Sequence, residues 1–116
     1  MQFSIEFYET VSGQCPVREF LDALRLSDPD DFASVMAGLA RLRNRLYHKP
    51  PLSKSLGNDL FELRHVGKLN TRVLYFFMKR QRIIALHGMR NKGREIPARD
   101  IKTALVRKND WMARHR

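Results

Sequence analysis

The sequence has little cysteine and no long hydrophobic run. Cys15 is the single cysteine among 116 residues, so the chain cannot form an internal disulfide. No residues near Cys15 have metal-ligand spacing, and a reducing cytoplasm is the expected compartment. No apolar run approaches the roughly 20 residues that cross a bilayer, and residues 1–9 alternate like a strand instead of forming an export signal. We therefore expect a cytoplasmic protein without membrane contact, cofactor or metal.

Acidic residues are scarce in the second half of the chain. Residues 1–61 contain 7 Lys and Arg against 8 Asp and Glu, whereas residues 62–116 contain 15 against 4. The net charge of +10 therefore comes from the C-terminal half. Such a lopsided charge favours encounter with a polyanion or an acidic protein. The alternative is a solvated basic surface that keeps a small protein soluble.

The length and patterning predict one domain over residues 1–116, because the chain is long enough to bury a core and contains no repeat or linker. Residues 3–8 alternate between apolar and polar side chains, which predicts a first strand. Three more strands are predicted between Leu60 and Lys92, where apolar runs are separated by turn residues at 67–70 and 79–81. Within them Phe61 and Leu63 alternate with Glu62 and Arg64.

Prolines mark the predicted helices. Pro16, Pro29 and Pro97 each suit the first position of a helix, and Pro50 with Pro51 ends the second one. The expected buried stripes are Val17, Phe20, Leu21 and Leu24 in the first helix, Phe32, Val35, Met36, Leu39, Leu42 and Leu46 in the second, and Ile101, Ala104, Leu105 and Met112 in the last. The predicted fold is α+β with the order βααβββα. Two N-terminal helices and a C-terminal helix accompany a small, mostly antiparallel four-stranded sheet.

This order and several short motifs resemble the RelE/HigB toxins of bacterial type II toxin–antitoxin systems, and among them the phage-derived Gp49-like proteins of the RelE/ParE superfamily. The similarity extends over nearly the whole chain. The motifs that carry it are Phe61-Glu62-Leu63-Arg64, Arg72-Val73-Leu74-Tyr75, the run Ala85-Leu86-His87-Gly88-Met89-Arg90-Asn91-Lys92, and Ile96-Pro97 followed by Asp100, Ile101 and Ala104.

The resemblance implies a toxin that enters the ribosomal A site and cuts mRNA without a metal. It also implies a cognate antitoxin that holds the toxin inactive, expected to be a helix-turn-helix protein encoded next to it. Relatives usually carry two adjacent basic residues after the last strand. Here Asn91 takes the first of these places and Lys92 the second, while Met89 stands where an aromatic residue is common.

Metal-free RNA cleavage needs an aligned ribose 2′-OH, a group that moves protons, and cations that stabilise the charged phosphorane. Arg64 and Arg72, on neighbouring predicted strands, are expected to clamp the phosphate. Arg90 and Lys92, on the loop predicted after the last strand, are expected to close over it. His87 is the first candidate for proton transfer, because its unperturbed pKa lies near neutrality. The predicted catalytic set is thus Arg64, Arg72, His87, Arg90 and Lys92.

Each of these residues also has a structural interpretation. A histidine in an apolar strand can instead be packed and hydrogen-bonded, and Arg64 can simply pair with an acid. His65 is the reserve candidate for proton transfer. Further phosphate contacts without a chemical role are predicted at the turns, where charged residues are common in any case: Lys68, Lys79, Arg80 and Arg82.

Three functions remain open from the sequence. The leading hypothesis is a ribosome-dependent endoribonuclease, an mRNA interferase that inhibits translation. The second is a non-catalytic inhibitor of DNA gyrase, as in ParE relatives, and the third is an inactive prophage remnant that only binds its antitoxin. The first depends on one geometric premise, that the predicted cations converge on a single hollow.

Overall fold

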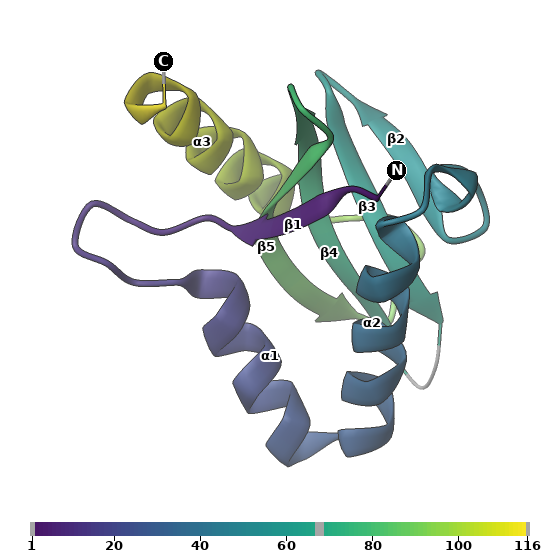
Figure 1. Ribbon diagram of the computed structural model, residues 1–116. Coiled ribbons are helices and arrows are strands. Elements are labelled where there is room, and N and C mark those ends of the chain that lie inside the picture. The colour runs from purple at the N-terminus through teal and green to yellow at the C-terminus, as the bar shows by residue number, and fades with distance from the viewer. Residues whose placement is uncertain (1, 67–68, 116) are drawn as a thin grey trace.

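The computed structural model describes residues 2–66 and 69–115 and contains a five-stranded sheet with helices on both faces (Figure 1). The strands are β1 (Ser4–Phe7), β2 (Ser53–Gly57), β3 (Leu60–Val66), β4 (Asn70–Met78) and β5 (Arg82–Asn91). The helices are α1 (Pro16–Ser27), α2 (Pro29–Leu42) and α3 (Ala98–Arg114), with a short 3-10 turn η1 (Arg45–Tyr47). The predicted α+β class is confirmed.

The sheet has the order β1-β5-β4-β3-β2, in which β1 is parallel to β5 and the other neighbours are antiparallel. The prediction of four strands was wrong, because β2 lies between Pro51 and Leu60, where no strand had been predicted. Gly57, Asn58 and Asp59 have positive φ angles of 86°, 53° and 57° and turn the chain directly into β3. β2 has little apolar alternation because it is an edge strand, and the sequence pattern therefore does not reveal it.

Apolar side chains fill both faces of the sheet. Leu63, Val73 and Ile83 pack under α1 and α2, whereas Leu74 and Ile84 pack under α3. Figure 1 shows α1 and α2 together on one side of the strands and α3 on the other. We call these the α1/α2 face and the α3 face. Among the described residues, no helix is long and apolar enough to span a membrane.

The second helix is shorter than predicted. α2 ends at Leu42, and the side chain of Asn44 accepts a hydrogen bond from the Leu46 backbone N–H and so begins η1 instead. Leu46 is consequently 70% exposed and does not join the buried stripe. Met36 and Met112, also predicted to face the core, are 40% and 43% exposed.

The parallel pair of β1 and β5 carries a two-point ion pair. Arg82 donates from Nε to Glu6 Oε2 at 2.5 Å and from Nη2 to Glu6 Oε1 at 2.9 Å. This fork-to-carboxylate geometry uses much of the guanidinium. Arg82 is therefore not a free cation at the turn, and the prediction of a phosphate contact there is not supported by its pairing.

We expect the Glu6–Arg82 pair to make a small contribution to the stability of the fold that is lost in acid. The hydrogen bond from Arg82 is the largest cause acting on Glu6 and lowers the pKa of its carboxyl below the ordinary 4.5. A carboxyl with a depressed folded pKa stabilises the fold above its unfolded pKa and loses that contribution as the pH falls through the folded value. Glu6→Gln should therefore lower the melting temperature, followed by circular dichroism, at pH 7 but not near pH 3.

The shift at pH 7 should be about one or two degrees, because solvent screens this half-exposed pair. Glu9→Gln, at an exposed acid two residues beyond β1, is the matched control. Equal losses for Glu6→Gln at both pH values would contradict the assignment.

Candidate functional site

The five predicted catalytic residues are divided between the two faces of the sheet. The register of β4 with β5 shifts between Leu74 and Tyr75, so that Leu74 pairs with His87 and Tyr75 pairs with Ala85. This bulge inserts one extra residue and reverses the alternation of β5 beyond it. His87 therefore lies on the α3 face together with Arg72, whereas Arg90 lies on the α1/α2 face. Arg90 had been predicted to lie on the loop after the last strand, but it belongs to β5.

Arg72 is completely buried, with 0% of its surface exposed. Its Nη1 donates to Asn91 Oδ1 at 2.6 Å, and its Nη2 donates to the carbonyls of Gly93 at 3.3 Å and Arg94 at 2.5 Å. Its Nε lies 3.5 Å from Glu62 Oε2, which is an ion-pair distance without a hydrogen bond. Arg72 thus ties the segment that follows β5 to the centre of the sheet.

Burial is the main cause that lowers the pKa of Arg72, and the nearby positive charge of Arg64 acts in the same direction. The carboxylate of Glu62, itself buried, opposes both effects. A guanidinium in this environment remains charged, since arginine is protonated at any ordinary pH. Its donors are directed to protein acceptors, so Arg72 positions the loop and is not open to a phosphate in this structure.

His87 is held between two partners on α3. Its Nε2 lies 2.7 Å from Asp100 Oδ1, and its Nδ1 lies 3.0 Å from Nη1 of Arg107. Arginine can only donate, so Nδ1 accepts and Nε2 carries the hydrogen that is donated to Asp100. The same Nη1 of Arg107 donates to the Leu86 carbonyl at 2.9 Å, and burial lowers the pKa of this guanidinium. The imidazole is 16% exposed and belongs to a His–Asp pair that links β5 to α3.

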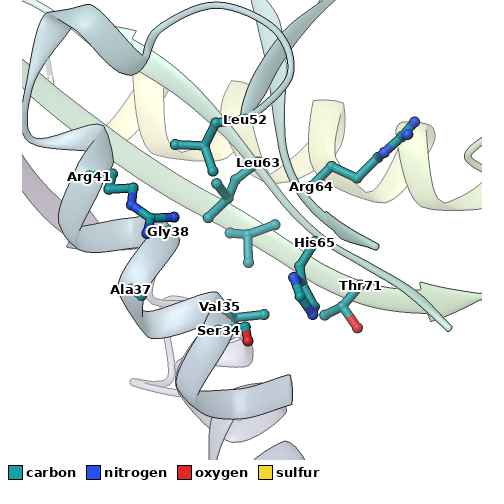
Figure 2. A pocket seen from close by; sticks show the side chains of 11 residues that line it. Ser34, Val35, Ala37, Gly38, Arg41, Leu52, Leu63, Arg64, His65 and Thr71 are labelled. Carbon is teal, nitrogen blue, oxygen red and sulfur yellow. The ribbon is translucent and has the colours of Figure 1, made fainter. Parts of the chain in front are cut away.

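A second polar cluster lies on the α1/α2 face, at the beginning of α2. Arg90 donates from Nη2 to Asp28 Oδ2 at 2.9 Å, lies 3.2 Å from Asp31 Oδ2, and donates from Nε to the Thr71 hydroxyl at 3.1 Å. Thr71 in turn donates to Asp31, and His65 Nε2 lies 3.2 Å from Asp31 Oδ1. Figure 2 shows His65 and Thr71 side by side at one end of a cavity beside α2. Arg90 and the reserve residue His65 are therefore engaged on the opposite face from Arg72.

Arg64 and Lys92 are the two predicted catalytic residues that remain exposed. Arg64 pairs directly with Arg72 across β3 and β4, so both project from the α3 face. Lys92 belongs to the segment that Arg72 holds, next to the exposed Arg94. We call Arg64, Lys92 and Arg94 the basic rim of Arg72.

The predicted phosphate contacts at the turns do not join this rim. Lys79 and Arg80 lie at the β4–β5 turn, at the opposite end of a nine-residue strand from Asn70. At about 3.3 Å per residue this separation is of the order of 25 Å. Lys68 lies outside the described residues. The premise that the cations of the strands and of the following segment converge on one hollow was also wrong, because Arg90 lies on the opposite face of the sheet from Arg64 and Arg72. A smaller group around Arg72 takes its place.

Sequence reasoning missed the acids and the arginine that hold these candidates. Glu62, Asp31, and the pair Asp100 and Arg107 come from three different elements, β3, α2 and α3, and no sequence spacing links them to their partners. Asp100 lies within a family-like motif, which was the one available signal. In residues 2–66 and 69–115 no group of three or more His, Cys, Asp or Glu side chains is placed to hold a metal ion.

Comparison with known proteins identifies the class. The family model described as "Phage derived protein Gp49-like (DUF891)" matches residues 19–109, which include the basic rim, both histidine pairs and most of α3. This family is part of the RelE/HigB-type toxin group, and at family level the match fits the toxin of a toxin–antitoxin pair. The chain belongs to the Gp49-like phage-derived protein family. No curated protein matches it.

Proposed function

We propose that this chain is the toxin of a type II toxin–antitoxin module and acts as an endoribonuclease on ribosome-bound mRNA. The observation that carries the proposal is the basic rim of Arg72. The exposed Arg64 lies directly opposite the buried Arg72, and the exposed Lys92 and Arg94 belong to the segment that Arg72 holds through Asn91 Oδ1 and the carbonyls of Gly93 and Arg94. The backbone that carries Lys92 and Arg94 is thus held next to Arg72, which brings exposed cations near one another, as stabilisation of a charged transition state requires.

In the proposed reaction the ribose 2′-oxygen attacks the adjacent phosphorus and the bond to the 5′-oxygen breaks, giving a cyclic phosphate and a 5′-hydroxyl. Arg64 and Lys92 stabilise the additional negative charge on the phosphorane. One proton leaves the 2′-hydroxyl and one is delivered to the departing oxygen.

We assign the proton transfer to His87, because it lies on the α3 face while His65 lies on the other. Asp100 orients its ring, and Arg107 must release Nδ1 before this nitrogen accepts a proton. Arg72 acts as a positioning residue that keeps the rim in place. A cognate antitoxin neutralises the toxin by binding it, as family membership supports.

The test is cleavage of a defined mRNA on translating ribosomes by the purified protein, with 5′ ends mapped by primer extension. The double substitution Arg64→Ala and Lys92→Ala should lower the cleavage rate about 100-fold or more, since loss of a single transition-state donor typically costs that much. The fold should persist because both side chains are exposed.

The matched control removes two exposed cations elsewhere, Arg18 and Arg25 on α1, and should leave the rate within about twofold. Equal losses of cleavage rate in both variants would show that only the net charge matters, and would overturn the role assigned to the basic rim. Intact messages together with inhibition of DNA supercoiling would point to a gyrase inhibitor instead. Growth that is unaffected by abundant folded protein would indicate a chain that only binds its antitoxin.

A further inference from the structure

A cleft runs along α2 where this helix faces β3 and the segment that precedes β2. It consists of two adjoining pockets of about 430 Å³ and 210 Å³, which share Arg41, Leu52 and Arg64. Figure 2 shows the smaller pocket, with Arg41 at one end and His65 at the other. The larger pocket is lined further by Leu46, Tyr47, Lys49, Pro50 and Pro51. Of the residues that line these two pockets, only Arg64 belongs to the basic rim.

The larger pocket combines positive charge with an exposed aromatic ring. Arg41 and Lys49 contribute two cations, and none of the eight lining residues is acidic. Tyr47 is 42% exposed, although aromatic side chains of a core are normally covered. It lies on η1, which Asn44 caps, so that the ring is presented on an ordered turn. Cations beside an exposed aromatic ring are the elements that bind single-stranded RNA.

The opposite end of the cleft is lined by acidic residues. The smaller pocket shares Ser34 and His65 with a third pocket, whose lining includes Asp28, Asp30 and Asp31. Arg90 pairs with Asp28 and Asp31, so this end carries no excess of positive charge, and a polyanion is attracted more strongly to the end with Arg41 and Lys49. Charge therefore favours the larger pocket for an RNA strand, and the volume of this pocket suits a single nucleoside.

Arg64 connects this pocket with the basic rim. The pairing of β2 with β3 ends at Ser53 opposite Leu63, so Arg64 is the first residue of β3 beyond that pairing, at the border of the sheet. It lines the larger pocket, and it also projects beside Arg72 on the α3 face. Figure 2 shows its side chain extending away from the cleft. An RNA strand whose phosphate is bound at Arg64 can thus continue over the border into the pocket.

We propose that the pocket of Tyr47, Arg41 and Lys49 binds one nucleotide of the RNA strand whose phosphate Arg64 contacts. The base stacks on Tyr47, and Arg41 and Lys49 neutralise the flanking phosphates. This inference rests on the proposed function, since it supplies that reaction with a substrate subsite. It adds an RNA contact outside the sheet face, on a part of the chain to which no role has been assigned.

The experiment measures binding of a short single-stranded RNA to the full-length protein without ribosomes, by fluorescence anisotropy. Tyr47→Ala should weaken binding about tenfold, which is the size of one base–aromatic stack, whereas Tyr47→Phe keeps the ring and should bind within about twofold of the original. Lys49→Ala should reduce the salt dependence of binding. An RNA that contains 5-iodouridine should crosslink to Tyr47, as located by mass spectrometry.

Leu26→Ala on α1, which also removes an exposed apolar side chain, is the control and should bind normally. Unchanged binding by Tyr47→Ala, or equal losses in Tyr47→Ala and Tyr47→Phe, would overturn the proposal. So would weaker binding of the antitoxin with unchanged RNA binding, because the pocket would then receive an acidic peptide.

Failure of the nuclease proposal gives a different result. A protein that crosslinks to RNA at Tyr47 but never cleaves it would refute the proposed function and leave this binding site standing. Cleavage that depends on Arg64 and Lys92 but not on Tyr47, together with unchanged RNA binding by Tyr47→Ala, would refute the binding site at Tyr47 and leave the proposed function standing.

Discussion

Arg72→Ala should destabilise the protein by about 3–5 kcal/mol, the usual cost of removing one partner from a buried ion pair. The substitution leaves the Glu62 carboxylate buried without a counter-charge, and it removes the donors that hold Asn91 and the carbonyls of Gly93 and Arg94. Urea unfolding followed by circular dichroism measures the loss. Amide exchange should also become faster in residues 91–95, because their link to β4 is broken.

Two further variants separate this explanation from a general loss of charge. Adding Glu62→Gln to Arg72→Ala should recover part of the stability, with a coupling of about 0.5–3 kcal/mol, since the unpaired carboxylate is then gone. Arg64→Ala, at the exposed residue directly opposite Arg72, should change stability by no more than about 0.5 kcal/mol. If Arg72→Ala unfolded at the same urea concentration as the original protein, its role as a brace would be refuted.

Gly88→Ala should destabilise the protein by about 1–3 kcal/mol through overpacking. A Cβ at this position would come within 2.3 Å of Phe20 Cδ2 and 2.6 Å of Phe20 Cγ. The Phe20 ring packs on β5 from α1, and its Cγ is too near the backbone to swing away easily. The substitution therefore forces α1 to move from the sheet, which thermal unfolding would record as a lower melting temperature.

Gly93→Ala is the matched control, because a Cβ there would only reach Asn91 Nδ2 at an ordinary 3.6 Å. It should leave the melting temperature nearly unchanged. Phe20→Ala should cost less in the Gly88→Ala background than alone, since the added methyl then occupies part of the vacated space. Equal melting temperatures for Gly88→Ala and the original protein would show that α1 does not pack on β5 as described.

The placement of the arginines changes how substitutions in this protein are to be interpreted. Loss of toxicity in Arg72→Ala would be expected from instability alone, so it would not identify Arg72 as a catalytic residue. Arg90 is similarly bound to Asp28 and Asp31 at the beginning of α2. Arg64 and Lys92 are the informative positions, because their exposure allows activity to change without the fold.

Much of the fold was determined by the sequence itself. The apolar spacing of Val17, Leu21 and Leu24 predicted the buried face of α1, and the structure confirms it. The alternation from Leu60 onwards predicted three consecutive strands, which are β3, β4 and β5. Such patterns are local, and they are legible because burying one face of a helix or strand imposes a fixed period on the chain.

The site depended on tertiary structure. The bulge opposite Leu74 turns His87 to the α3 face and Arg90 to the other, although the sequence of β5 gives no sign of it. Likewise, Arg72 and Arg64 carry the same charge on adjacent strands, yet one is buried against Glu62 and the other is exposed. Local sequence predicts which residues lie in strands, whereas strand register and the packing of α3 decide which cations remain free to bind a phosphate.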